Sequence, residues 1–168
     1  MTGSSIPKLK AALTARLRAD PLIGGSGVQV WYGDEYPTPV DAENITLGGT
    51  KDADPFRGDS TFGAGQSAAA IGKRSREERY ALDVIVRVRA HGRTPQQGVT
   101  ERAFTLEALV ESSIQTWSST TPSAFGGVVD GAFITSVTHI EGLVADKADQ
   151  RGCDITLTVA CRKRLATT

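Results

Sequence analysis

A run of alternating residues from Glu77 to Ala90 restricts the fold of this chain more than any other feature. Alternate positions are apolar, and those between them are partly charged: Tyr80, Leu82, Val84, Val86 and Val88 against Ala81, Asp83, Ile85, Arg87 and Arg89. A period of two residues is typical of a strand with one buried face. The run is long for a strand and leads into a strong helix signal, so we expect it near the middle of an antiparallel sheet.

The length and composition fit a single domain over residues 1–168. With 168 residues and 39% hydrophobic content, the chain is large enough to bury a core without disulfides or metals. Its start lacks the apolar stretch of a secretory leader, and no apolar run is long enough to cross a bilayer. We therefore expect a cytoplasmic product that has no membrane partner.

The charges balance overall but are unevenly distributed. Nineteen Lys and Arg stand against nineteen Asp and Glu, which argues against a protein that binds nucleic acid by neutralising its phosphates. Between Asp34 and Asp59, seven acidic residues against two basic ones give a net charge of −5. Basic residues gather instead at 8–18, 73–79 and 162–164.

Two stretches have the period of an amphipathic helix. The first begins after Ser4 and Ser5, which are possible N-caps, and runs to about Ala19, where Pro21 stops it. The second is introduced by Thr94-Pro95-Gln96-Gln97, which has the form of a capping box. Their apolar positions repeat every three or four residues: Ile6, Leu9, Leu13 and Leu17 in the first, and Val99, Ala103, Leu106, Val110, Ile114 and Trp117 in the second.

Four further stretches are predicted as strands, at 28–32, 43–47, 132–145 and 152–162. The last two are joined by a polar turn and form a hairpin. Cys153 and Cys161 fall on one face of its second strand, about 26 Å apart at roughly 3.3 Å per residue, too far to form a disulfide. The sequence therefore predicts an α+β fold, with a mostly antiparallel sheet of about four to five strands, two helices packed on one face and a long flexible loop.

The long loop covers about 50–75 and has no sustained periodicity. Loops of this length inside a compact domain tend to be functional or disordered. We interpret it as an arm that becomes ordered against a partner. Its basic end, with Lys73, Arg74 and Arg76, is the candidate contact with a neighbouring subunit.

No motif in the sequence predicts a catalytic, cofactor-binding or metal-binding residue. Residues 63–68 fit G-x-G-x-x-A and residues 65–69 resemble a nucleophile elbow, but neither has the preceding strand that these motifs require. Asp52, Asp54 and Asp59 lack the spacing of a calcium loop, so a solvated acidic loop is the better interpretation. His139 and Glu141 share a strand face and are suited to acid–base chemistry, although a solvent-exposed pair is commoner.

The order of these elements resembles that of the tail terminator proteins of long-tailed, non-contractile bacteriophages of the lambda type. The likeness spans most of the chain. The segments that carry it are Leu17-Arg18-Ala19-Asp20-Pro21-Leu22, Val28-Gln29-Val30-Trp31-Tyr32-Gly33-Asp34, Glu77-Glu78-Arg79-Tyr80, Val84-Ile85-Val86-Arg87-Val88, Gly92-Arg93-Thr94-Pro95 and Arg102-Ala103-Phe104 with Glu111.

The resemblance implies a structural virion protein and not an enzyme. Members of this family form a homohexameric ring on the head-proximal end of the tail tube, stop tube polymerisation and join the tail to the head. The implied partners are further copies of the chain, the major tail tube protein and the head-completion or neck proteins, with DNA passing through the channel without specific binding. We expect Asp52, Asp54 and Asp59 to face that channel, because carboxylates do not hold phosphates. The basic end of the long loop, with Lys73, Arg74 and Arg76, is the candidate contact with a neighbouring subunit or with the tube end.

Two other classes remain open. Another head–tail connector, such as a head-closure or tail-completion protein, could share this fold and size. A small-molecule-binding or enzymatic α+β domain that uses the long loop as a lid is the alternative from a different class.

Overall fold

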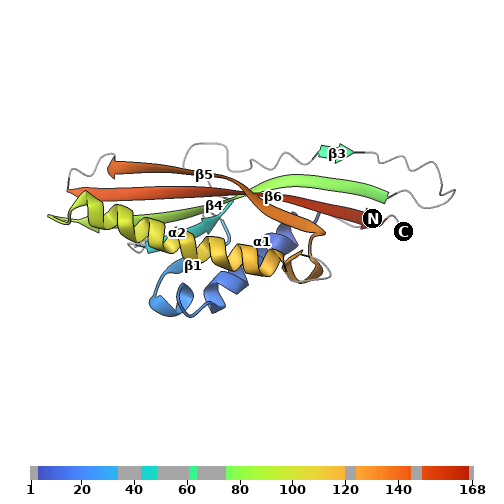
Figure 1. Cartoon of the computed structure of the whole chain (residues 1–168), viewed down its shortest axis with the longest axis horizontal. Helices are drawn as coiled ribbons and strands as arrows, with labels where there is room; N and C mark the ends of the chain where they lie inside the picture. The colour runs from blue at the N-terminus through green and yellow to red at the C-terminus, as the bar shows by residue number, and fades with distance from the viewer. Residues whose placement is uncertain are drawn as a thin grey trace.

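In the computed structural model, two helices lie on one side of a long twisted sheet (Figure 1). The structure describes residues 4–33, 43–48, 61–63, 75–119, 124–144 and 149–166. The elements are α1 (Ile6–Ala19), β1 (Gln29–Trp31), β2 (Glu43–Leu47), β3 (Thr61–Gly63), β4 (Ser75–His91), α2 (Gln96–Ser118), β5 (Gly131–Leu143) and β6 (Gln150–Ala166), with short 3-10 helices at Gly24–Ser26 and Ala124–Gly127.

The described residues form a sheet of six strands in the order β1-β2-β4-β6-β5, with β3 also paired to β4. Every pair is antiparallel except β1 with β2, which is parallel. This confirms the predicted α+β fold. The strand beyond the predicted number is β3, whose three residues lie in the expected loop and are too few to produce a readable period.

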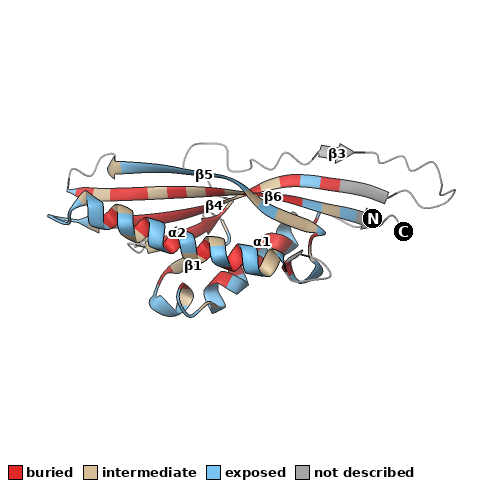
Figure 2. Cartoon of the chain, viewed as in Figure 1, coloured by how far each residue is buried: buried red, intermediate tan, exposed pale blue. Residues whose placement is uncertain are grey.

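Strand β4 lies between β2 and β6, as its long alternating pattern predicts. It pairs with β6 over its whole length, from Ser75 opposite Ala166 to His91 opposite Gln150. The apolar positions of both strands point into the core under the helices, as the alternating red bands in Figure 2 show. The alternate residues of β4 and β6 on this face are all buried: Tyr80, Leu82, Val84, Val86, Val88, Cys153, Ile155, Leu157, Val159 and Cys161.

Both helices bury the predicted stripes against this face. Leu9, Leu13 and Leu17 of α1 are at most 1% exposed, and burial of each such side chain stabilises the fold by about 1.5–3 kcal/mol. On α2 the stripe from Val99 to Ile114 is buried, and Trp117 completes it with an edge-on contact to Phe125 at 4.8 Å between ring centroids.

The helix starts differ from the expected capping patterns. Helix α2 begins one residue later than the Thr94 box predicts, so Pro95 becomes the N-cap and the Thr94 hydroxyl donates instead to the carbonyl of His91. The side-chain amide of Gln96 donates to the carbonyl of Gly152 at 3.1 Å. The first turn of α2 is therefore tied to β6 and not to a capping side chain.

A buried carboxylate on β4 holds the start of α1. Glu78 is fully buried and accepts bonds from the Ser5 amide at 2.9 Å, from the Ser5 hydroxyl at 2.7 Å and from the Ser4 hydroxyl. The Ser5 hydroxyl also contacts the Tyr80 hydroxyl at 3.1 Å. A negative charge beside the free N–H groups of a helix start is favourable. The Glu78 carboxylate, and not a serine side chain, therefore stabilises the start of α1.

Replacing Glu78 should loosen α1. In Glu78→Ala the Ser5 amide and hydroxyl lose a buried acceptor, and we expect the free energy of unfolding to fall by roughly 2–4 kcal/mol in urea denaturation. Glu101→Ala removes the same charge from an exposed position on α2 and should change stability by less than about 0.5 kcal/mol. Equal losses in the two variants would contradict this role for Glu78.

Candidate functional site

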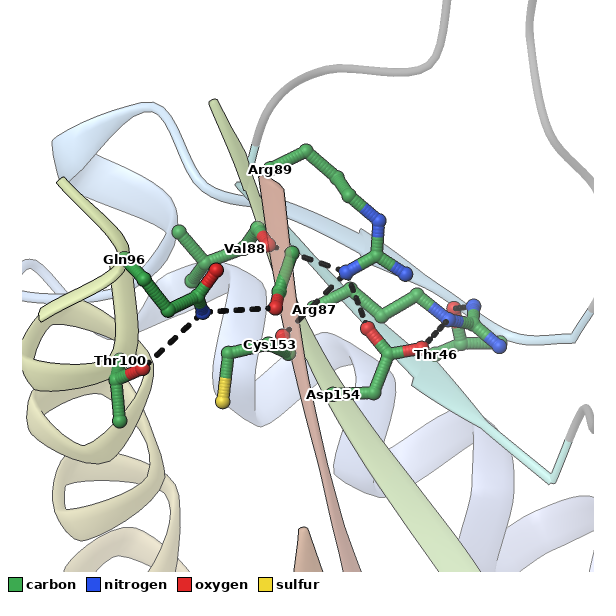
Figure 3. A network of polar contacts seen from close by, with 9 residues as sticks. Thr46, Arg87, Val88, Arg89, Gln96, Thr100, Cys153 and Asp154 are labelled. Atoms are coloured by element: carbon green, nitrogen blue, oxygen red, sulfur yellow. Dashed lines mark hydrogen bonds and ion pairs between the residues drawn. The ribbon is translucent and has the colours of Figure 1, made fainter. Parts of the chain in front are cut away.

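The sheet face without helices, called here the open face, has a polar centre (Figure 3). The Arg87 guanidinium donates to Thr46 Oγ1 at 3.1 Å, and its Nε lies 3.7 Å from Asp154 Oδ2. Arg89 forms an ion pair with the other oxygen of Asp154. These contacts connect β2, β4 and β6. They account for Arg87, whose exposure of 7% is unusual for a charged residue on the solvent side of a sheet.

Gly152 gives Arg89 the room it needs to reach Asp154. The two residues are register partners on β4 and β6, and a Cβ at position 152 would lie 2.8 Å from Arg89 Nη1. The guanidinium therefore reaches β6, where it donates to the carbonyl of Cys153 at 3.4 Å, and it also donates to the carbonyl of Val88 on β4 at 3.1 Å. We interpret this network as structural.

Removing the shared counter-charge should destabilise the sheet. In Asp154→Asn, Arg87 and Arg89 keep their charges in partly buried positions, and we expect a loss of about 1–3 kcal/mol in the free energy of unfolding. The matched variant Asp149→Asn, at an exposed turn position, should lose less than about 0.5 kcal/mol. An unchanged urea midpoint for Asp154→Asn would show that the network contributes nothing.

Strand β5 forms one edge of the sheet and exposes most of its apolar side chains. It lies at the end of the strand order, and its thirteen residues include Glu141 as the single Asp, Glu, Lys or Arg and no proline. The exposed fractions are 66% for Phe133, 44% for Val137, 79% for Ile140 and 66% for Leu143. Sheet edges are usually protected by lysine, proline or a cover, so a bare apolar edge indicates an interaction surface.

The exposed side chains lie on both faces of β5. Phe133 and Ile140 are opposite Ala160 and Asp154 of β6 and therefore point to the open face, whereas Val137 is opposite Leu157 and points to the helix side. On the helix side, α2 contacts the strand through polar and aromatic groups. Phe104 meets the ring of His139 at 5.4 Å between centroids, and the Thr100 hydroxyl donates to Glu141.

The open face is hollowed where β4, β5 and β6 run together near the end of β6. This basic hollow has a volume of about 680 Å³. The small side chains of Ala81 and Ala160 leave space on the sheet surface. Phe133 also lines the hollow, and Arg79 and Arg162 make it positively charged. Its lining residues are Arg79, Tyr80, Ala81, Gly131, Ala132, Phe133, Ala160, Cys161 and Arg162.

A second hollow lies at the other end of the same face. It has a volume of about 160 Å³ and is lined by Arg89, Ile140 and Asp154 together with the turn ends of β5 and β6. This is below the size of a typical small-molecule pocket. Glu141 lines it, but that carboxylate accepts the Thr100 hydroxyl.

The residues predicted as sites from the sequence lie largely outside the described part of the chain. Lys73 and Arg74, and likewise Asp52, Asp54 and Asp59, are outside it, and Arg76 belongs to β4 but its side chain is not described. Their roles in subunit contact and at the channel stay predictions.

Arg79 and Arg162 form a basic cluster that sequence reasoning did not assemble. The two residues come from separate basic stretches of the sequence and become direct neighbours only through the register of β4 and β6. The sequence does contain a signal, because β4 and β6 both alternate clearly, and antiparallel pairing of the two strands would place the basic stretches 73–79 and 162–164 side by side. The sequence does not show that these two strands are neighbours, so this pairing could not be predicted.

The cysteines are buried side chains of the core. Cys153 and Cys161 are free and buried, as predicted. Burial raises the pKa of the Cys161 thiol to about 12. Burial also raises the pKa of the Cys153 thiol above its ordinary value, so neither cysteine is a ready nucleophile. Within the described segments, no group of three or more His, Cys, Asp or Glu side chains is arranged to hold a metal ion.

Glu107 is a carboxylate on α2 whose environment disfavours its charge. It is 8% exposed on α2, and burial, followed by the nearby Glu111, raises its pKa above the ordinary value of 4.5. A raised carboxyl pKa in the folded state means that the unfolded chain releases its proton first. The contribution of Glu107 to stability therefore becomes less favourable as the pH rises above about 4.5.

Neutralising Glu107 should consequently stabilise the protein at neutral pH. We expect Glu107→Gln to raise the melting temperature at pH 7 by a few degrees, and to match the parent protein at pH 4, where both states of the parent are largely protonated. Glu111→Gln, at a half-buried position one turn later, is the comparison. A Glu107→Gln protein that is less stable at pH 7 would show that the carboxylate has a stabilising partner.

Comparison with known proteins gives no family for this chain. No model of a known protein family matches the sequence, and the search of curated proteins finds no match. In the part of the chain that the structure describes, neither helix is long and apolar enough to cross a membrane.

Proposed function

We propose that this chain is a tail terminator subunit of a long-tailed, non-contractile bacteriophage. Copies of it form a homohexameric ring on the head-proximal end of the tail tube, stop tube polymerisation and join the tail to the head. The ring contacts the major tail tube protein on one side and the neck proteins on the other, and DNA passes through without specific binding. The protein acts in the virion after assembly in the host cytoplasm, and its role is structural.

The observation that carries this proposal is the apolar edge strand β5. Four large apolar side chains are between 44% and 79% exposed along one strand. Burying such side chains against a partner contributes about 1.5–3 kcal/mol each when burial is complete. An edge of this kind favours a protein that works as an assembled subunit.

The distribution of charge gives further support. A closed ring needs two different patches on each subunit that fit each other. The open face carries the basic hollow, while the sequence concentrates acidic residues between Asp34 and Asp59. A basic surface and an acidic stretch of sequence on the same chain are suited to such a contact.

The family resemblance also falls on coherent parts of the fold. The segment that ends with Leu22 closes α1, the segment around Trp31 forms β1, and the segment from Glu77 to Val88 forms the central strand β4. These elements and the start of α2 all belong to the sheet or to the helices that pack on it. A different connector of the same neck would have a similar organisation, and the position of its gene beside a tail tube gene would separate the two.

A small-molecule-binding or enzymatic domain is the second candidate. Its support is the volume of the basic hollow, about 680 Å³, which is within the range of ligand pockets. A pocket with His139 at its base would favour this candidate, but His139 lies exposed on β5 against Phe104. The state of assembly distinguishes this candidate from a ring.

The proposal predicts a discrete ring. In sedimentation velocity over a wide concentration range, with and without magnesium, we expect a species of about six subunits, because a ring of closed symmetry stops growing when it closes. Negative-stain images of that species should show a ring with a central hole. A protein that is monomeric under every condition, and that also fails to bind the ends of purified tail tubes, would overturn the proposal.

A further inference from the structure

We propose that two copies of the chain pair through the outer edge of β5, in antiparallel orientation around a twofold axis at Ile140. Residues 137–143 of each copy form the pairing, and the two sheets join into one. This inference goes beyond the proposed ring and does not rest on it. A twofold contact uses the same patch on both copies, whereas a ring needs two different patches.

The backbone of β5 directs a row of hydrogen-bonding groups to the outer edge of the sheet. Among the described strands, β5 is the last in the order and pairs with β6. The Val144 N–H donates to the Gln150 carbonyl at 2.8 Å, and the register from there back to position 136 is continuous. Because the direction of these groups alternates along a strand, every second residue points them away from β6. These residues are Val137, His139, Glu141 and Leu143.

Pairing around Ile140 matches the exposed apolar side chains of β5 to one another. On the helix side, Val137 lies opposite Leu143 of the second copy, and these side chains are 44% and 66% exposed in the single chain. On the open face, the two copies of Ile140, each 79% exposed, lie opposite each other at the axis. Side chains are closest at such a non-hydrogen-bonded position. Three of the four exposed apolar residues of β5 are therefore covered by apolar neighbours.

The same pairing gives the charged residue of β5 a polar neighbour. Glu141 lies opposite His139 of the second copy, and the Cβ atoms of opposite residues are about 4.5–5.5 Å apart. An imidazole N–H of His139 can then donate to the Glu141 carboxylate. Glu141 already accepts the Thr100 hydroxyl, but a carboxylate accepts several hydrogen bonds, so the contact with α2 can persist. The edge is therefore complementary to itself in charge as well as in apolar surface.

The neighbouring registers match these residues less well. If the axis moves one residue to Glu141, the two Glu141 carboxylates lie opposite each other, and like charges in such positions are destabilising. If it moves one residue the other way, to His139, the apolar side chain of Val137 lies opposite Glu141. The register around Ile140 avoids both conflicts.

Helix α2 leaves the edge of β5 accessible. It contacts the strand through Phe104 and Thr100 near His139 and Glu141. Val137 nevertheless stays exposed on this side of the sheet. Figure 2 shows β5 pale blue over most of its length. A second strand can therefore approach the edge while α2 keeps its place on the sheet.

Cysteine cross-linking tests the position of the axis. Ile140→Cys places two thiols opposite each other where Cα atoms are about 4.5 Å apart, a distance suited to a disulfide. In Thr138→Cys, on the same face, the two thiols would be about 13 Å apart. Under mild oxidation we expect Ile140→Cys to form a covalent dimer on non-reducing gels at least about tenfold faster than Thr138→Cys. Cys153 and Cys161 are buried in both variants. Equal or faster cross-linking of Thr138→Cys would overturn this register.

Sedimentation equilibrium tests the contact without a cross-link. We expect the parent protein to be in a reversible monomer–dimer equilibrium at about 100 μM, because a contact of roughly 1,200 Å² or less is typical of transient association. Ile140→Lys replaces an apolar contact at the axis by two like charges and should raise the dissociation constant at least about tenfold. Phe133→Lys, on the same strand and face but outside 137–143, should pair like the parent protein. Circular dichroism establishes that both variants are folded. Equal weakening by both would overturn the pairing at Ile140.

The pair and the proposed ring can fail separately. The pair belongs to the free protein, because it occupies the edge strand that supports the proposed assembly. If the parent protein forms rings but Ile140→Cys does not cross-link, the pair is overturned and the ring stands. If Ile140→Cys cross-links but the parent protein neither forms rings nor binds the ends of tail tubes, the pair stands and the proposed function is overturned. A parent protein that is monomeric at all concentrations, with no cross-link at position 140, would overturn the pair.

Discussion

The long antiparallel pairing of β4 with β6 is the contact on which the rest of this structure depends. The two strands pair residue by residue from Ser75 to His91. Their inner faces supply the apolar surface that both helices cover, and the N-terminal half of β4 also carries Glu78, which holds the start of α1. On its other edge, β4 pairs with β2 and β3. A shift of this pairing by one residue would turn every apolar side chain of a strand to the wrong face.

The two faces of the sheet are stabilised by different physical means. The helix side is stabilised by apolar packing, which is non-directional. It includes the edge-on contact of Trp117 with Phe125. The open face relies on directional contacts, with Asp154 neutralising Arg87 and Arg89 at its centre. Towards the end of β6 these contacts give way to the basic hollow. In that region neither apolar packing nor the ion pairs of Asp154 cover the sheet.

Sequence reasoning succeeded where burial repeats along one element. The alternation of β4 and β6 and the stripes of α1 and α2 come from side chains that share one buried face, and such patterns are readable without knowing the neighbours. The apolar residues of β5 show the limit of that reasoning. Phe133 and Ile140 read as part of an alternating strand, yet they are exposed because the strand is at the sheet edge and points them to the face without helices.

Features that depend on contacts between two distant segments could not be predicted from the sequence pattern. The parallel pairing of β1 with β2 has no local signal in the sequence. Glu78 has the appearance of a solvent-side acid in a charged lead-in, and only the approach of α1 makes it a buried acceptor. The cluster of Arg79 with Arg162 likewise required the register of a pairing between residues far apart in the sequence.

The β4–β6 pairing also has a mechanical consequence. In an antiparallel ladder the hydrogen bonds run across the strands, so a pull along the strand axis loads all of them in shear at the same time. Seventeen paired positions share that load, whereas a pull across the sheet edge at β5 opens its bonds one after another. The subunit is therefore stiff along its length and weakest at the edge, which is the place where a neighbouring molecule could reinforce it.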